Sequence, residues 1–126
     1  MDPVVHFELP VTDIERAMRF YSTMFGWQSQ RPPGVGFAFT KTTEVDPKTF
    51  MPTAPARING SMLVRQGALQ HPIVTVKVAD LDAALAAVAK AGGKVVLGKR
   101  DVGPIFSAYI EDCEGNVIGV VQDKPR

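Results

Sequence analysis

The sequence predicts an α+β fold made of two related halves, each of which runs strand, helix and then three strands. Two observations carry this prediction: an amphipathic helix recurs at a fixed spacing, and short strand-like segments separated by turn residues follow each helix. The chain has 126 residues, of which 45% are hydrophobic and 21% charged, and this suffices to bury one core without disulfides. We expect a single domain over residues 1–126, with one module over about 3–66 and a second over about 70–124.

The first module is expected to begin with a strand over Val4–Leu9, where β-forming residues are frequent. Successive side chains of a strand point to opposite faces, so His6 and Glu8 would share one face. Three further strands are expected after the first helix, near Gln28–Gln30, Gly36–Thr40 and Gly60–Arg65. Residues 41–59 are rich in Thr and contain three prolines, which predicts a long surface loop, either a lid or a variable connection.

A helix is predicted between the first two strands. Thr12 and Glu15 have the spacing of a capping box, and Gly26 is suited to end the helix. Apolar residues between these signals follow a 3.6-residue period, which is typical of a helix with one face on a sheet. They are Ile14, Ala17, Met18, Tyr21 and Phe25.

The same pattern returns 67 residues later. Asp13, at the start of the first helix, corresponds to Asp80, and Gly26 corresponds to Gly93. A β-branched segment precedes both helices, and the apolar stripe also recurs, as Leu81, Ala84, Leu85 and Val88. Because the strand, the acidic cap, the stripe and the glycine coincide at one offset, we infer an internal repeat.

The second module is expected to begin with a strand over Pro72–Val78, before the second helix. Its remaining strands are expected near Lys94–Leu97, Ile105–Glu111 and Val117–Gln122. The last two are separated by Glu114, Gly115 and Asn116, a turn signal in which the glycine can adopt the positive φ that a hairpin requires.

Composition excludes several classes of function. With 14 basic and 13 acidic residues the net charge is +1, which gives no general attraction for nucleic acid or for an anionic membrane. Cys113 is the only cysteine, so no disulfide can form within the chain, and a reducing compartment is favoured. No basic segment with an apolar core opens the chain, and no apolar run approaches the roughly 18 residues of a membrane span. We therefore expect a cytoplasmic protein.

Six segments of the chain carry a recognisable family pattern. They are His6–Ala17, Phe20–Tyr21 and Phe25–Trp27 of the first module, and Val78–Ala84, Ala91–Gly93 and Glu111–Ile118 of the second. Together they resemble the vicinal oxygen chelate superfamily, which includes glyoxalase I, bleomycin-resistance proteins and extradiol dioxygenases. The resemblance covers nearly the whole chain, and the chain departs from the family pattern at Cys113, where proline is more usual.

The resemblance implies a cupped mixed sheet built from two β-α-β-β-β modules, with the helices on its outer face and a ligand pocket inside. It also implies a homodimer, as in many single-domain members. Catalytic members typically hold a divalent metal through four His, Glu or Gln ligands on the first and fourth strands of both modules. His6 falls at the first of these positions and is the one weak candidate metal ligand.

The remaining metal ligands are not found in the sequence. The second module has Ile73 where the first has His6, and Gly119 lies near the position of a carboxylate. The expected strand Gly60–Arg65 contains no His, Asp or Glu. His71 lies two residues before Ile73, at the mouth of the strand, and is not counted as a ligand. Because a stable site usually needs three or four protein donors, no cofactor is expected, although a divalent metal stays open as the alternative.

Seven residues are candidates for the pocket. His6 and Glu8 could bind a polar group of a ligand or act as acid and base, with structural hydrogen bonding as the competing interpretation. Phe37 and Phe39 alternate along one strand and, with Trp27 and Tyr109, could form an aromatic wall, although core packing is the favoured role for each of the four. Small hydroxyl residues that could complete a polar floor are Ser61, Thr75 and Ser107. The predicted pocket set is His6, Glu8, Phe37, Phe39, Ser61, Thr75 and Tyr109, and no residue is assigned a catalytic role.

Three functions stay open on these grounds. The first is metal-independent binding of a small hydrophobic molecule, because the scaffold is retained while the ligand set is not. The second is a lyase, isomerase or dioxygenase that uses a divalent metal through His6 and donors placed wrongly by a strand register error. The third is an accessory interaction domain with a vestigial pocket. A small molecule is thus the expected partner, with neither nucleic acid nor membrane.

Overall fold

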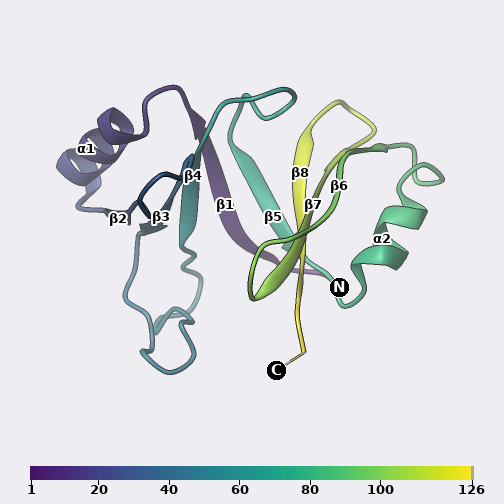
Figure 1. Ribbon diagram of the computed structural model, residues 1–126. Coiled ribbons are helices and arrows are strands. Elements are labelled where there is room, and N and C mark those ends of the chain that lie inside the picture. The colour runs from purple at the N-terminus through teal and green to yellow at the C-terminus, as the bar shows by residue number, and fades with distance from the viewer. Residues whose placement is uncertain (126) are drawn as a thin grey trace. The chain divides into compact units, whose positions relative to one another are not determined.

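The computed structural model of the protein describes residues 1–125, which form eight strands and two helices (Figure 1). Each half runs strand, helix and three strands, as the internal repeat predicts. No helix among these residues is long and apolar enough to cross a membrane. The elements are β1 (Val4–Val11), α1 (Ile14–Phe25), β2 (Gln28–Gln30), β3 (Phe37–Lys41), β4 (Gly60–Val64), β5 (Ile73–Lys77), α2 (Leu81–Ala87), β6 (Lys94–Asp101), β7 (Ile105–Glu111) and β8 (Val117–Asp123).

The chain divides into two compact units. The N-terminal half is His6–Pro72, and the C-terminal half consists of Met1–Val5 together with the chain from Ile73 onward. The backbone N–H of Lys77 in β5 donates to the carbonyl of Pro3 at 3.0 Å, which ties the first residues to the C-terminal half. The sequence pattern places residues 3–5 with the first module. An internal repeat shows where each module begins, but it does not show which strand these first residues pair with.

In the N-terminal half the strand order is β2-β3-β4-β1, with β1 and β4 parallel and the other pairs antiparallel. Figure 1 shows α1 beside the strands of this half. Ala38 and Met62 are register partners on one face and are completely buried. Phe7 lies on this same face and contacts Trp27, which stacks on Tyr21 of α1, so this is the face that α1 covers.

Helix α1 begins one residue later than the capping-box spacing predicts. Asp13 is the N-cap, in an extended conformation, and its carboxylate accepts a hydrogen bond from the backbone N–H of Arg16 at 3.0 Å. The Thr12 hydroxyl instead accepts from Nη1 of Arg65 at 3.1 Å. The predicted end is confirmed, because Gly26 has φ +71° and its N–H donates to the carbonyl of Ser22.

In the C-terminal half the strand order is β5-β8-β7-β6, and α2 packs on one face through Leu81, which contacts Ala108 and Val120. Asp80 caps α2 as predicted, accepting from the N–H of Ala83 at 3.0 Å. Figure 1 shows α2 beside the strands of this half.

Helix α2 ends at Ala87, before the residue that the repeat predicts. The N–H of Val88 donates to the carbonyl of Leu85, three residues back, so the last turn is tight and the chain leaves the helix there. Gly93, the counterpart of Gly26, therefore does not cap the helix. It lies against β7, where a Cβ atom would stand 2.3 Å from the carbonyl oxygen of Glu111. The glycine recurs because the backbones approach closely at this point.

The β7–β8 hairpin forms as predicted, and Gly115 has φ +83°. The Asp112 carboxylate organises the turn, because one of its oxygens accepts from the N–H groups of Glu114 and Asn116 at 2.8 and 2.9 Å. Its other oxygen accepts from Nδ2 of Asn116 at 3.0 Å. These hydrogen bonds hold the pKa of Asp112 below its usual value.

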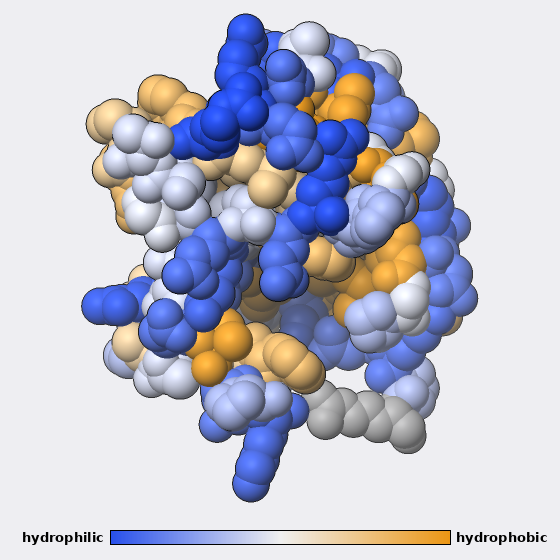
Figure 2. Space-filling model, turned by 60° about the vertical axis from the view of Figure 1, so that its left-hand side comes forward, coloured by the Kyte–Doolittle hydropathy of each residue, from blue (hydrophilic) through white to orange (hydrophobic). Residues whose placement is uncertain are grey.

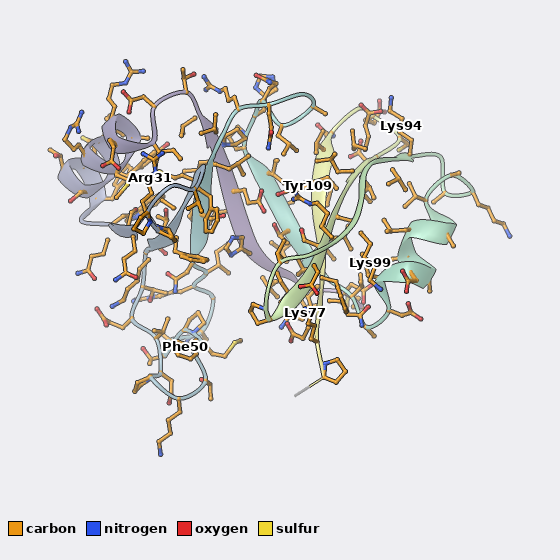
Figure 3. All side chains as sticks on the ribbon, viewed as in Figure 1. Arg31, Phe50, Lys77, Lys94, Lys99 and Tyr109 are labelled. Atoms are coloured by element: carbon orange, nitrogen blue, oxygen red, sulfur yellow. The ribbon has the colours of Figure 1, made fainter. Side chains whose placement is uncertain are left out.

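The loop between β3 and β4 is a long excursion, as the prolines predict, and it has internal order. The side-chain oxygen of Asn59 accepts from the N–H groups of Thr42 and Thr43 at 2.7 and 3.0 Å, which closes the base of the loop. Val45 and Pro52 form an isolated antiparallel bridge. Phe50 has φ +58° and is 76% exposed, near the far end of the loop (Figure 3).

Candidate functional site

The face of the N-terminal half that does not carry α1 brings together five of the seven predicted pocket residues. In the strand register Glu8 lies opposite Ser61, and Ser61 lies opposite Phe39. The side chains of these residues alternate with those of the α1-covered face, which is why a period of two places them together. We call this surface the aromatic face and define it by His6, Glu8, Phe37, Phe39 and Ser61.

Two large aromatic side chains are exposed on the aromatic face. Phe37 and Phe39 are 37% and 57% exposed, whereas Ala38 between them is buried. Their ring centres are 5.2 Å apart at an angle of 82°, an edge-to-face arrangement that is favourable for a pair of aromatic rings. Core packing, the role that the sequence favoured for this pair, would have buried both rings. On the face that Figure 2 shows, apolar side chains lie in separate patches between hydrophilic ones.

His6 and Ser61 form the polar part of the aromatic face. Nε2 of His6 lies 3.1 Å from the Ser61 hydroxyl, a hydrogen-bond distance, and both side chains are half-buried. Burial lowers the pKa of His6, because desolvation disfavours the charged imidazolium, so the ring is held in its neutral form. A neutral imidazole can accept through one ring nitrogen and donate through the other, and it does not attract anions.

The other two predicted pocket residues belong to the C-terminal half and are buried there. Thr75 of β5 is 1% exposed, and its hydroxyl has no hydrogen-bond partner among the described residues. Gly119 is its register partner on β8, and Tyr109 of β7 lies next in the same row. The guanidinium carbon of Arg100 lies 5.6 Å from the centre of the Tyr109 ring (Figure 3 labels Tyr109).

Trp27 does not join the aromatic wall proposed for it. Its ring stacks on Tyr21 at 4.8 Å and contacts Phe25 and Phe7, all on the α1 side of the half-sheet. Trp27 precedes β2, so the alternation of side chains between the two faces of a strand, which places Phe37 and Phe39, does not apply to it. It lines a shallow groove of about 470 Å³ beside α1, together with polar residues such as Arg19.

The residues at the family's metal positions do not fit a divalent ion. In the N-terminal half, His6 is joined by Ser61, a neutral hydroxyl, on the fourth strand. In the C-terminal half, Ile73 is a buried aliphatic side chain and Gly119 has no side chain. A Cβ at Gly119 would lie 2.9 Å from the Thr75 hydroxyl, so a carboxylate could enter there only if Thr75 moved.

One imidazole among these four positions falls short of the three or four donors that zinc or a similar ion requires. Within residues 1–125, no group of three or more His, Cys, Asp and Glu side chains is placed to hold a metal. His71 is exposed and lies before β5 begins, so it does not supply the missing donor.

Comparisons with known proteins agree with the architecture. The family model described as bleomycin resistance protein-like N-terminal matches residues 4–42. A protein from Didymella fabae described as a glyoxylase-like domain-containing protein is 33% identical over 112 residues, covering 86% of this chain and 84% of that protein.

Solved structures show the same fold at low sequence identity. Streptomyces coelicolor methylmalonyl-CoA epimerase in complex with 2-nitronate-propionyl-CoA is similar with a TM-score of 0.64, 15% identity and coverage of 97% of each chain. A glyoxalase/bleomycin resistance protein/dioxygenase superfamily member from Vibrio splendidus gives a TM-score of 0.63 at 14% identity, covering 98% of this chain and 100% of that one. These likenesses support the fold alone. The fungal relative, the N-terminal family match and this architecture together show that the chain belongs to the glyoxalase-like vicinal oxygen chelate superfamily.

Proposed function

We propose that this protein binds a small apolar molecule on the aromatic face of its N-terminal half, and does so without a metal. The observation that carries the proposal is the pair of exposed rings, Phe37 and Phe39, directly beside the hydrogen-bonded His6 and Ser61. Ligand sites are typically apolar surfaces with a few polar groups that orient the ligand, and this face has that composition.

The aromatic pair leaves apolar surface in contact with water that a ligand can cover. Covering apolar surface contributes roughly 25 cal/mol per Å², and a Phe side chain presents on the order of 150 Å² or more. Phe39 is 57% exposed, whereas its neighbours on the strand are buried. A ligand that covers the Phe39 ring would therefore remove apolar surface from water that the folded chain leaves exposed. The edge-to-face contact with Phe37 holds the ring in place, which reduces the entropy lost on binding.

The polar pair supports orientation of the ligand more than affinity. Ser61 lies between Glu8 and Phe39 in the strand register, so a ligand on the rings has a hydroxyl within reach. The neutral His6 ring holds that hydroxyl and can exchange its hydrogen bond for one to the ligand. We infer a binding function because the neutral His6 ring and the Ser61 hydroxyl can orient a ligand by hydrogen bonds beside an exposed apolar surface.

A fluorescent probe tests the proposal. N-phenyl-1-naphthylamine is neutral and aromatic, and its emission rises in apolar surroundings; we expect saturable binding to the native protein and a higher melting temperature. Phe39→Leu should weaken binding at least about fivefold, since an aromatic contact is lost. Phe50→Leu is the matched control, because Phe50 is exposed on the loop of the same half and outside the aromatic face.

Equal binding by Phe39→Leu and the native chain would place the probe elsewhere and overturn the proposal. Elemental analysis of untagged protein purified without chelators tests the alternative enzyme. We expect no stoichiometric divalent metal; a stoichiometric metal that disappears in His6→Ala would instead establish a metal-dependent protein. The dimer that the family resemblance implies is also proposed here, and light scattering after size exclusion measures it.

A further inference from the structure

In the C-terminal half, four residues of β6 and β7 lie together on the face of the half-sheet that α2 does not cover. Ala108 of β7 packs on the α2 side, so its two neighbours, Ser107 and Tyr109, point to the other face. Arg100 of β6 is the register partner of Ser107, and Leu97 is the register partner of Tyr109. We call this group the arginine cluster and define it by Leu97, Arg100, Ser107 and Tyr109.

An irregularity in β6 brings Arg100 to this face. The register shifts by one residue between Leu97 and Arg100, so three residues of β6 span two residues of β7, as in a β-bulge. With regular alternation Lys99 would share a face with Leu97. Instead the Lys99 ammonium lies on the α2 side, 3.0 Å from the Asp82 carboxylate. The bulge therefore sends two adjacent cations to opposite faces.

Arg100 differs from the lysines around it in having no carboxylate partner. Four lysines on or beside the strands of this half are each paired with a carboxylate, and Figure 3 labels three of them. The pairs are Lys77 with Asp123, Lys94 with Glu111, Lys99 with Asp82 and Lys124 with Asp101. Among residues 1–125 Arg100 forms no ion pair, and its guanidinium carbon lies 5.6 Å from the centre of the Tyr109 ring. This face therefore carries one positive charge that the chain does not neutralise.

Ser107 places a hydroxyl at the base of the arginine cluster. The residue is 7% exposed, and cross-strand partners of an antiparallel pair have Cβ atoms about 5 Å apart. A hydroxyl next to a guanidinium can donate to the same anion that the guanidinium binds. The Tyr109 ring lies against the cation and supports its position, since an aromatic face attracts a guanidinium.

A carboxylate is the anion that this arrangement fits. The planar guanidinium presents parallel N–H donors to both oxygens of a carboxylate, and the Ser107 hydroxyl adds a third donor. One unpaired cation also matches one negative charge, whereas a phosphate monoester carries nearly two.

The arginine cluster also has an apolar part. Leu97 is 38% exposed and lies in the row next to Arg100 on the same face. A ligand whose carboxylate meets the guanidinium can therefore cover the Leu97 side chain with an apolar substituent, which removes apolar surface from water.

We propose that the arginine cluster binds a carboxylic acid with an apolar substituent, whose carboxylate contacts Arg100 and Ser107 and whose substituent covers Leu97. This inference goes beyond the proposed function, because it assigns a second site, in the other half of the chain, and a charged class of ligand. It does not depend on Phe37 or Phe39.

A titration of the ¹⁵N-labelled native protein with 3-phenylpropionate tests the proposal. In ¹H–¹⁵N spectra at low ionic strength we expect saturable shifts of the amides of Leu97, Arg100 and Ser107. The neutral 3-phenylpropionamide has nearly the same shape and should bind about tenfold or more weakly, because it lacks the charge. We expect 2-phenylethyl phosphate to bind no more tightly than the carboxylate.

Arg100→Gln is the decisive variant, because it removes the charge from an exposed side chain and keeps a hydrogen-bonding group. It should weaken 3-phenylpropionate about tenfold, and Arg100→Lys should weaken it about threefold, since the charge stays and the paired donors are lost. Lys90→Gln is the matched control: it removes a positive charge from an exposed position in the turn after α2 and should leave the affinity unchanged.

Two results would overturn the inference outright: equal affinity for 3-phenylpropionate and its amide, or an unchanged affinity in Arg100→Gln. Tighter binding of 2-phenylethyl phosphate would overturn the assignment of a carboxylate. Phe39→Leu separates this inference from the proposed function, because it should weaken N-phenyl-1-naphthylamine and leave 3-phenylpropionate unchanged. Loss of 3-phenylpropionate binding in Phe39→Leu would place the compound on the aromatic face and contradict a site at Arg100.

Discussion

Thr40 and Thr75 are both central strand residues with 1% exposure, and they differ in whether the hydroxyl has a partner. The Thr40 hydroxyl lies 3.3 Å from that of Ser29, whereas the Thr75 hydroxyl has no partner among residues 1–125. A buried hydroxyl without a partner carries the cost of its desolvation with no compensating bond, about 1–3 kcal/mol. The two residues therefore make opposite contributions to stability in similar surroundings.

We expect Thr75→Val to raise the free energy of unfolding by about 1 kcal/mol, because it exchanges an unpaired hydroxyl for a methyl group of similar size. Thr40→Val should lower it by about 1 kcal/mol, since it leaves Ser29 without its partner. Urea unfolding monitored by circular dichroism measures both. A loss of stability in Thr75→Val comparable to that in Thr40→Val would show that the Thr75 hydroxyl is satisfied in solution.

Gly26 and Gly93 occupy equivalent positions of the internal repeat but serve different purposes. Gly26 ends α1, whereas Gly93 allows the chain to pass close to the backbone of β7. Because a Cβ here would meet the Glu111 carbonyl oxygen at 2.3 Å, Gly93→Ala should destabilise the protein by about 3 kcal/mol through displacement of β7. Gly98→Ala in β6 is the control: nothing lies within 4 Å of its Cβ, and we expect a change of at most about 0.5 kcal/mol. Equal melting temperatures for the two variants would contradict the close approach.

At the scale of elements, local chemistry made the helices and the last hairpin predictable. Asp80, Gly26 and Gly115 act within a few residues of their own position, so their roles can be read from the neighbouring residues. The end of α2 could not be predicted this way, because Gly93 is required by a strand that lies far along the chain.

Only those features of the candidate site that depend on the alternation of side chains along a single strand could be predicted from the sequence. Alternation along β1 and β3 correctly groups His6 with Glu8 and Phe37 with Phe39. The hydrogen bond between His6 and Ser61 depends on the parallel pairing of β1 with β4, across 55 residues of sequence, and no local signal encodes that register. Trp27 lies outside a strand, so alternation does not place it, and the structure gives it the packing role beside α1.

The start of α1 provides an element-scale test. Asp13→Ala should lower the free energy of unfolding by about 1 kcal/mol, because it removes the acceptor for the N–H of Arg16. Thr12→Ala should cost about 0.5 kcal/mol or less, since it removes only an exposed hydrogen bond to Arg65. Chemical denaturation of the two variants decides which residue caps the helix. A larger loss of unfolding free energy in Thr12→Ala would show that Thr12 is the N-cap, as the capping-box spacing predicts.

For the whole molecule, three groups with lowered pKa values contribute to the way stability responds to acid. Burial lowers the pKa of His6, and hydrogen bonds, chiefly from Lys124, lower that of Asp101. Hydrogen bonds from Asn116 do the same for Asp112. In each case the unfolded chain binds a proton at a higher pH than the folded chain, so acid favours unfolding.

Stability should therefore fall in two separate steps as the pH is lowered. The first begins below about 6.5, the unfolded pKa of histidine, and ends at the lower folded pKa of His6; the second begins below about 3.9, where unfolded aspartates take up protons. His6→Gln should abolish the first step, while His71→Gln, which leaves the buried imidazole in place, should retain it. Melting temperatures between pH 8 and pH 3 measure both steps. A first step that survives in His6→Gln would mean that another group is responsible, and that the ring beside Ser61 is not held neutral by the fold.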